Sequence, residues 1–430
     1  MGTYRHPGTV LTEHVFSVPL DHARPDGERI EVFAREVVAA GRERDALPWL
    51  LFLQGGPGFR ADRAVGRAKW LDRALRDYRV LLLDQRGTGR STPVSARSLA
   101  RRGLLSPSAQ ADYLALFRAD SIVADAELIR VALAGGEPWA LLGQSFGGFC
   151  TVAYLSWYPE GIREAFITGG LPGLAATAGD VYRLTYPQVA GKVAAHYARY
   201  PMDVARARDI ARRLADGGVT LPDGRPLTVE AFQSLGMPLG FGNGSHQLHY
   251  LLEDALDGDG ELTDGFLHAV LGQLSFAGNP LYALVHEGCY AQGQATRWAA
   301  QRVRAELGGF DAGPALDGDA PLPFTGEMIY PWTVEQDPLL APLREAADLL
   351  AERDGWPPLY DPARLAACSV PVAAAVYYDD MYVPRELSMA TAAAIGGLRA
   401  WVTNEWEHDG LGASNGAVLD RLIAMNRGDA

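Results

Sequence analysis

A serine in a glycine-rich turn is the first residue whose setting suggests chemistry. The stretch Gly143-Gln144-Ser145-Phe146-Gly147 matches the G-x-S-x-G pattern of a nucleophile elbow, in which a strained bend between a strand and a helix exposes the serine. An apolar run, 139–142, precedes the motif and a helix-like run, 149–158, follows it, which is the context that the pattern requires. The alternative is a glycine-rich turn that leaves an ordinary serine in solvent.

A serine hydroxyl is a weak nucleophile at neutral pH, so Ser145 needs a general base, and the base needs a carboxylate to orient it. In G-x-S-x-G proteins the expected chain order is serine, acid, histidine. Of nine histidines, only His408 follows the last predicted strand, in the polar loop 404–410. We therefore predict that His408 is the base. The alternative is an ordinary histidine in a surface loop.

Two carboxylates at the end of the apolar run 370–378 compete for the role of the acid. Asp380 stands four residues before Pro384, where the next helix is predicted to begin, and we prefer it on this chain position. The alternative is that Asp379 orients His408 while Asp380 caps a turn.

The oxyanion that forms during acyl transfer needs hydrogen-bond donors already in place, and backbone N–H groups meet that need without rearranging. Phe146, just after the nucleophile, is one predicted donor. The others are predicted at Gly55 and Gly56, in the glycine-rich loop that follows the first long apolar run, 48–53. A tight turn with no role in catalysis is the alternative for this loop.

The elements that must position these residues follow a β-α-β pattern. Three apolar runs each end in a polar, glycine-rich loop: 48–53, 78–83 and 139–142. Ligands bind outside the carboxyl ends of parallel strands, so the three loops should converge on one crevice. In the second loop we expect Asp84 and Arg86 to form a structural ion pair beneath the site.

The remaining segments complete an α/β fold with a mostly parallel sheet and helices on both faces. The alternating pattern 10–38 predicts an antiparallel hairpin at the sheet edge. Strands are predicted again at 370–378 and 400–403. Helices are predicted at 67–76, 109–134, 386–395 and 413–425.

Residues 174–342 interrupt this pattern. They read as mostly helical, with glycine-, proline- and aspartate-rich joints at 221–224 and 257–260 and no convincing buried strand. We predict an inserted helical cap domain at 174–342 and a discontinuous α/β-hydrolase core made of 1–173 and 343–430.

The bulk composition excludes several functions. The formal charge of −13 disfavours nucleic acid and anionic membranes as partners and favours a cationic ligand. Only three cysteines occur, far apart, which indicates neither a disulfide framework nor a cysteine-based zinc site. No run approaches the roughly 18 apolar residues of a membrane span, and the N-terminus lacks a signal-peptide core. We expect a cytoplasmic protein.

The motifs at 54–58, 84–91 and 143–148, in that order, resemble those of the prolyl aminopeptidases (proline iminopeptidases) of the α/β-hydrolase superfamily. The chain length and the segment 404–411 are similar to the larger size class of that family. One departure is Gln54, where many relatives have histidine. The resemblance implies hydrolysis of an unblocked N-terminal residue, usually proline, from peptides, without a metal or other cofactor.

The resemblance also implies that acidic cap residues bind the α-ammonium group of the substrate, because a desolvated cation needs carboxylate partners. Glu287 and Glu327 are the candidates, since each stands among aromatic and apolar neighbours. A solvated surface charge is the alternative for both. Five aromatic residues are candidates for the wall of a pocket for a small apolar ring, or are core residues: Phe146, Phe324, Tyr330, Trp332 and Tyr382.

Three functions compete. The leading one is a serine exopeptidase that releases N-terminal proline through an acyl-enzyme. The second keeps the same fold and triad but acts as an esterase or as an aminopeptidase of other specificity. The third is a ligand-binding relative with little turnover, against which the set of Ser145, Asp380 and His408 argues.

Overall fold

The computed structural model describes residues 2–430, and a nine-stranded sheet lies at its centre. The strand order is β1-β2-β3-β5-β4-β6-β7-β8-β9. The first three strands form an antiparallel meander, β3 joins β5 in antiparallel fashion, and all later neighbours are parallel. The strands are β1 (Thr3–His6), β2 (Thr9–Pro19), β3 (Arg29–Ala39), β4 (Trp49–Leu53), β5 (Arg79–Leu83), β6 (Trp139–Gln144), β7 (Ile162–Thr168), β8 (Val372–Tyr377) and β9 (Leu398–Thr403).

Helices cover both faces of the parallel part of the sheet, as the continuous apolar runs predict. In β4, Leu51 and Leu53 belong to one buried cluster, whereas Leu50 and Phe52 belong to another. Alternate side chains of a strand point to opposite faces, so β4 is covered on both sides. The first face carries α4 (Ala119–Ala134) and α5 (Phe146–Trp157), and the second carries α1 (Lys69–Ala74) and α19 (Ala417–Arg427). The predicted α/β-hydrolase fold class is confirmed.

Two of the predicted helices differ in the structure. The run 109–134 is divided between α3 (Pro107–Leu114) and α4, and the carbonyl of Leu116 between them accepts a hydrogen bond from the Arg86 guanidinium at 2.9 Å. The run 413–425 overlaps α18 (Gly410–Ala413) only at Ala413, and the helix that corresponds to it, α19, begins after Asn415 and Gly416, which have positive φ. The remaining helices of this part are α2 (Ala96–Arg101), η1 (Pro159–Gly161), α16 (Pro362–Ala366) and α17 (Arg385–Ala394).

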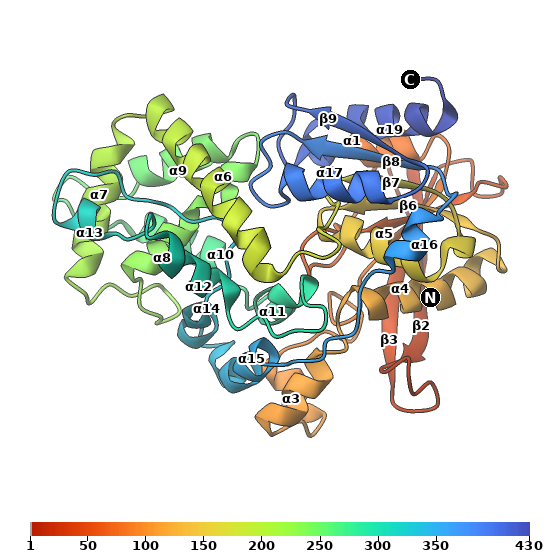
Figure 1. Cartoon of the computed structure of the whole chain (residues 1–430), viewed down its shortest axis with the longest axis horizontal. Coiled ribbons are helices and arrows are strands. Elements are labelled where there is room, and N and C mark those ends of the chain that lie inside the picture. Colours follow the sequence, from red (N-terminus) through yellow and green to blue (C-terminus); the bar gives the residue numbers. More distant parts are fainter. Residues whose placement is uncertain (1) are drawn as a thin grey trace.

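Between β7 and β8 the chain leaves the sheet, and in Figure 1 the helices of residues 174–342 (the inserted segment) gather beside it. They are α6 (Ala178–Arg199), α7 (Asp203–Ala215), α8 (Val229–Gln233), η2 (Ser234–Gly240), α9 (Gly244–Glu253), α10 (Asp264–Leu274), α11 (Pro280–Val285), η3 (Glu287–Cys289), α12 (Ala299–Leu307), α13 (Gly313–Leu316), α14 (Pro331–Gln336) and η4 (Ala341–Leu343), which ends one residue beyond the segment. The two predicted joints are turns, each closed by a single bridge: Thr220–Pro226 and Leu256–Leu262.

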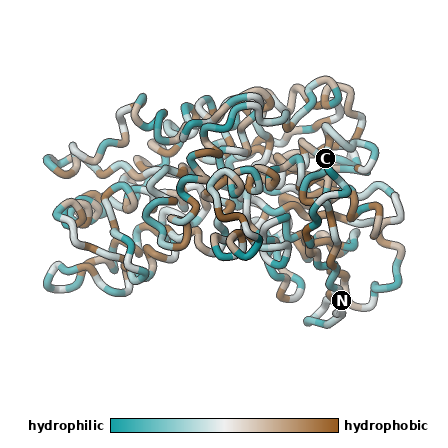
Figure 2. Tube along the Cα trace, turned by 90° about the horizontal axis from the view of Figure 1, so that it is seen from below, coloured by the Kyte–Doolittle hydropathy of each residue, from teal (hydrophilic) through white to brown (hydrophobic). Residues whose placement is uncertain are grey.

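One hydrophobic core joins the sheet and the inserted segment. The buried cluster on the α5 side of the sheet continues into the inserted segment, where it includes Tyr182, Phe232 and Val303. Figure 2 shows hydrophobic stretches running through both parts of the molecule. Helix α15 (Arg344–Ala351), just past the segment, packs against α3 and α14 and so touches both parts. Among the described helices, none combines the length and the apolarity needed to cross a membrane.

Candidate active site

The predicted elbow has the geometry that its sequence requires. Strand β6 ends at Gln144, helix α5 begins at Phe146, and Ser145 between them has φ 53° and ψ −123°. Positive φ is strained for a residue with a Cβ atom, and such strain is held by its surroundings. Here the Ser145 N–H donates to the Thr168 carbonyl of β7 at 2.9 Å. The glycine of the motif is essential for packing, since a Cβ atom on Gly147 would lie 1.9 Å from the Leu53 carbonyl oxygen.

The structure brings Ser145, His408 and Asp380 into one hydrogen-bonded chain. His408 Nε2 lies 2.9 Å from Ser145 Oγ, and His408 Nδ1 lies 2.7 Å from Asp380 Oδ2. The carboxylate only accepts, so it holds the imidazole with its proton on Nδ1. Nε2 then accepts from the serine hydroxyl, which is the arrangement in which a histidine can act as the base for a serine nucleophile.

The two candidate acids differ in their surroundings. Asp380 is 3% exposed, and its second oxygen accepts the backbone N–H groups of Tyr382 at 2.9 Å and Val383 at 3.0 Å. These two bonds fix the carboxylate facing His408. Asp379 is exposed and has no part in this network. The geometry therefore favours Asp380, because the turn after β8 buries this carboxylate against His408 and leaves Asp379 exposed.

The pKa of His408 is raised above its ordinary value. Burial of the ring by itself lowers the pKa, but the charge and hydrogen bond of Asp380 outweigh that effect, and the charges of Glu327 and Asp409 add to the increase. The raised pKa favours the protonated imidazolium that would form when the ring accepts a proton from a serine hydroxyl.

Ser145 opens into a pocket of about 170 Å³. The residues around it come from the loop after β4, from the elbow, from the inserted segment and from the segments that carry Asp380 and His408. They are Gln54, Gly55, Gly56, Phe59, Gln144, Ser145, Met237, Phe241, Tyr282, Glu327, Tyr382 and His408.

Gly55 and Gly56 lie at this pocket, as expected of oxyanion donors. A Cβ atom on Gly55 would stand 2.9 Å from Ser145 Cβ, so this backbone approaches the nucleophile as closely as only glycine allows. Gly56 has φ 70° and turns the chain away. Phe146 begins α5, and the first N–H groups of a helix have no partner within it. Its N–H is thus available next to Ser145.

Glu327 is the acidic residue of the pocket. Its carboxylate accepts a hydrogen bond from the Tyr282 hydroxyl at 2.5 Å, and it has no cationic partner in the part of the chain that the structure describes. A partly exposed carboxylate without a counter-ion, in the same pocket as Ser145, makes this pocket suited to a cationic ligand.

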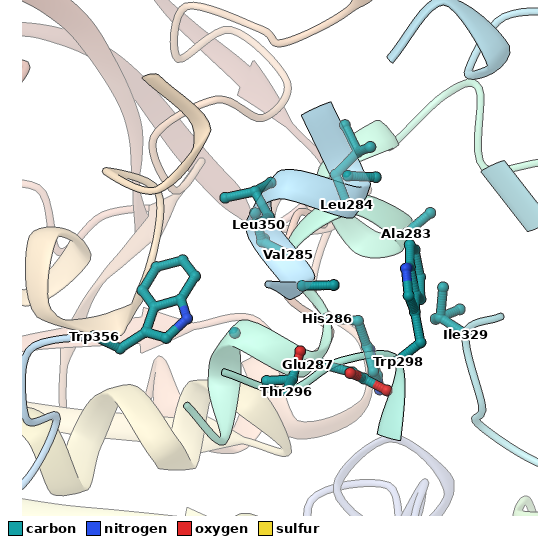
Figure 3. Close-up of a pocket in the computed structure, with 13 residues that line it drawn as sticks. Ala283, Leu284, Val285, His286, Glu287, Thr296, Trp298, Ile329, Leu350 and Trp356 are labelled. Atoms are coloured by element: carbon teal, nitrogen blue, oxygen red, sulfur yellow. The ribbon is translucent and has the colours of Figure 1, made fainter. Parts of the chain in front are cut away.

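Glu287 lies elsewhere. Its two oxygens accept the backbone N–H groups of Ala299 at 3.0 Å and Ala300 at 2.9 Å, at the start of α12. Figure 3 shows it in a different, smaller cavity, of about 20 Å³, together with Thr296 and Trp298. Burial raises its pKa although these two backbone bonds lower it. The sequence held a signal for this role, because the residue before α12 is Trp298, which cannot cap a helix.

Only one of the five aromatic candidates, Tyr382, lines the pocket at Ser145. Trp332 lines an adjoining apolar cavity of about 130 Å³, which shares Met237 and Phe241 with the pocket. Tyr330 is fully buried, with its hydroxyl 2.9 Å from that of Tyr186. The Tyr330 ring stacks on that of Trp332, with ring centroids 5.3 Å apart.

Sequence reasoning missed four residues that line the pocket: Phe59, Met237, Phe241 and Tyr282. Phe59 directly follows the motif 54–58, and its ring meets that of Tyr282 edge-on with ring centroids 5.1 Å apart. Met237 and Phe241 lie in and just after η2, whose glycines and proline resemble an ordinary loop, so nothing in the sequence marks them.

The predicted ion pair between Asp84 and Arg86 is wrong, because each residue has another partner. Arg86 is buried and binds Asp125 through two bonds of 2.6 and 2.7 Å. Asp84 binds Arg63 through two bonds of 2.7 Å. Both pairs are bidentate, so each of the two side chains is fully engaged by a partner other than the expected one.

Comparison with known proteins now places the chain. A family model described as "alpha/beta hydrolase fold" matches residues 48–215. A curated proline iminopeptidase from Aeromonas sobria is 50% identical over 415 residues, which cover 96% of each chain. The chain belongs to the proline iminopeptidase family of the α/β hydrolases.

Other members of the proline iminopeptidase family are also similar to this chain. One from Aspergillus aculeatus is 36% identical over 97% of this chain and 94% of its own. Among solved structures, a proline iminopeptidase-related protein from Thermus thermophilus is 17% identical, covers 96% of this chain and 97% of its own, and has a TM-score of 0.39. The family assignment rests on the two long sequence matches.

Proposed function

We propose that the protein is a prolyl aminopeptidase, a serine peptidase that releases an unblocked N-terminal proline from peptides. The observation that carries the proposal is the hydrogen-bonded chain Ser145–His408–Asp380 in one pocket with the unpaired carboxylate of Glu327. The full-length similarity to a curated proline iminopeptidase supports the same activity.

Acylation starts when His408 takes the proton of Ser145 and the serine oxygen attacks the carbonyl carbon of the N-terminal residue. Asp380 stabilises the resulting imidazolium. The N–H groups of Gly55, Gly56 and Phe146 are the donors for the oxyanion.

In the rest of the catalytic cycle, His408 acts first as an acid and then again as a base. His408 gives its proton to the leaving amine, and the shortened peptide departs. Water, deprotonated by His408, then attacks the acyl-enzyme, and the released residue leaves with a free carboxylate while Ser145 regains its proton.

Glu327 would bind the free N-terminal amine of the substrate. A protonated secondary amine in this pocket would meet the carboxylate that Tyr282 orients, and burial of that cation is favourable only with such a partner. Glu287 has a different role in this scheme: it fixes the first turn of α12 and so supports the inserted segment from within.

We also propose the division into a core, 1–173 and 343–430, and a cap, 174–342. The core supplies Ser145, Asp380 and His408 together with the backbone donors. The inserted segment supplies Glu327 and the apolar wall of Met237 and Phe241. Chemistry and substrate recognition would then lie on different parts of the chain.

A kinetic panel of aminoacyl naphthylamides, each free and N-blocked, tests the function. We expect the highest kcat/KM with free proline naphthylamide and no turnover of its N-acetyl form, because the acetyl group removes the charge that Glu327 binds. Equal rates on the free and blocked substrates would instead identify an esterase or amidase that ignores the amine.

A further inference from the structure

The loop that carries His408 is bonded to the inserted segment as well as to the core. This loop, residues 404–409, connects β9 to α18. The His408 backbone N–H donates to the carbonyl of Gly240, the last residue of η2, at 3.2 Å. Two residues on, the Gly242 N–H donates to Asp409 Oδ1 at 3.2 Å. The base of the triad is thus held by the segment that also carries Glu327.

A third bond, between side chains, joins the same loop to the longest helix of the inserted segment. Lys192 of α6 places its ammonium 2.6 and 2.7 Å from the two oxygens of Glu407, the residue directly before His408. The Lys192 side chain is 15% exposed and that of Glu407 is 32% exposed, so the pair is partly screened from water. Such a pair restrains the loop more than an exposed one would.

The composition makes this ammonium unusual. Lysine occurs only at positions 69 and 192, although Lys and Arg together number 39. A lysine ammonium is a compact charge, whereas a guanidinium is wider and planar and bonds through a fixed fork. The compact ammonium of Lys192 contacts both oxygens of Glu407. The backbone next to Glu407 carries His408 and sets its distance from Ser145.

We propose that Lys192 and Glu407 are positioning residues, which fix the His408 loop to α6 and so keep His408 Nε2 within reach of Ser145. The inference rests on the proposed function. As a consequence, the inserted segment both carries Glu327, which would bind the substrate amine, and holds the loop of His408, which would act as the base. We assign the pair a positional role, because the two side chains bond to each other and neither of them bonds to the His408 ring.

The test compares Lys192→Met, Glu407→Gln and the double variant with the full-length wild type on two substrates. Proline naphthylamide uses the amine site, and p-nitrophenyl acetate does not. We expect kcat to fall about tenfold on both substrates in each single variant, because small displacements of a catalytic group have large effects on rate. The double variant should lose no more than either single one. Lys192→Arg should recover part of the loss.

Arg183→Met is the matched control. Arg183 lies on the same helix and pairs with Glu306 of α12, inside the inserted segment, at 3.0 Å with both side chains nearly half exposed. This variant should keep wild-type kcat on both substrates. Melting temperatures of all variants, measured by circular dichroism, separate loss of fold from loss of position.

A pH profile of p-nitrophenyl acetate hydrolysis gives the second readout. In Lys192→Met, the maximal kcat on the pH-independent plateau should fall. The apparent pKa at which kcat declines on the acidic side should stay at its wild-type value. An unchanged kcat on the ester, a loss confined to KM for the prolyl substrate, or a shifted limb with an intact plateau would each overturn the inference. Failure of the wild type to hydrolyse proline naphthylamide would refute the proposed function instead, and the ester would still test the pair.

Discussion

Two glutamates with similar sequence surroundings have different tasks at the scale of single residues. Glu287 satisfies two backbone N–H groups of α12, whereas Glu327 accepts one bond from Tyr282 and keeps the rest of its charge for the pocket. A carboxylate whose lone pairs are taken by buried donors cannot also bind a substrate amine without leaving those donors unsatisfied.

We predict that Glu327→Gln lowers kcat/KM for proline naphthylamide by about 10- to 100-fold, since a hydrogen bond to a charged group contributes about 1.5–3 kcal/mol. Hydrolysis of p-nitrophenyl acetate, which has no amine, should change far less. Steady-state kinetics on both substrates measures this. Equal losses on the two would mean that Glu327 supports the triad and not the amine.

Glu287→Gln should give the opposite pattern. The neutral amide can accept only through one oxygen, so one helix N–H loses its partner, at a cost of about 1–3 kcal/mol. We expect a lower free energy of unfolding in urea with kcat/KM nearly retained. A loss of activity on the prolyl substrate without any loss of stability would contradict the structural role.

The raised pKa of His408 predicts the pH dependence. His408 must be neutral to accept the serine proton, so activity should fall as pH drops through its pKa, and this limb should lie above the ordinary 6.5. Because the Glu327 charge contributes to the increase, Glu327→Gln should move the limb to lower pH. The ester substrate reports this without interference from amine binding, and an unmoved limb would show that the carboxylate does not act on His408.

At the scale of elements, the elbow depends on how closely α5 packs against the end of β4. A Cβ atom on Gly147 would lie 1.9 Å from the Leu53 carbonyl oxygen, and a backbone atom cannot swing aside as a flexible side chain does. We predict that Gly147→Ala destabilises the fold by about 3 kcal/mol or more and removes activity, because the strand or the helix must move. Urea unfolding and ester hydrolysis measure both effects.

Gly191→Ala is the control for that substitution. Gly191 lies in the exposed middle of α6, where a new Cβ atom meets nothing within 4 Å, and helix propensity favours alanine there by about 1 kcal/mol. This variant should be as stable as the wild type or more so, and fully active. Comparable damage in the two variants would mean that the close approach at β4 is not what makes Gly147 necessary.

At the scale of the whole molecule, the core and the inserted segment are joined by a continuous hydrophobic cluster and by hydrogen bonds that cross between them. Tyr382, beside Asp380, donates its hydroxyl to the Met237 carbonyl, and its ring lies 4.6 Å from that of His408. Residues of the candidate active site are therefore part of the contact between the two parts of the chain.

We predict that the molecule unfolds in a single cooperative transition. Urea curves followed by far-UV circular dichroism, tryptophan fluorescence and ester hydrolysis should coincide, because neither part keeps its buried surface without the other. An inserted segment that melted first would separate these curves, and the activity would then disappear before most of the helical signal.

Local patterns in the sequence determined the sheet and the candidate nucleophile. Continuous apolar runs predicted strands that are covered on both faces, and the glycines around Ser145 predicted a sharp strand-to-helix bend. Both features depend on residues only a few positions apart in the sequence. The choice of His408 followed from chain order, since the last loop over the sheet contains one histidine.

Only the tertiary structure decided the partners. Asp380 rather than Asp379 faces His408 because the turn after β8 buries Asp380 and leaves Asp379 exposed. Arg86 pairs with Asp125, and Glu327 rather than Glu287 reaches the pocket, through contacts between residues far apart in the chain. The Arg86–Asp125 pair depends on how α4 packs against the loop after β5, and the position of Glu327 depends on how the inserted segment packs against the core. No spacing in the sequence encodes either arrangement.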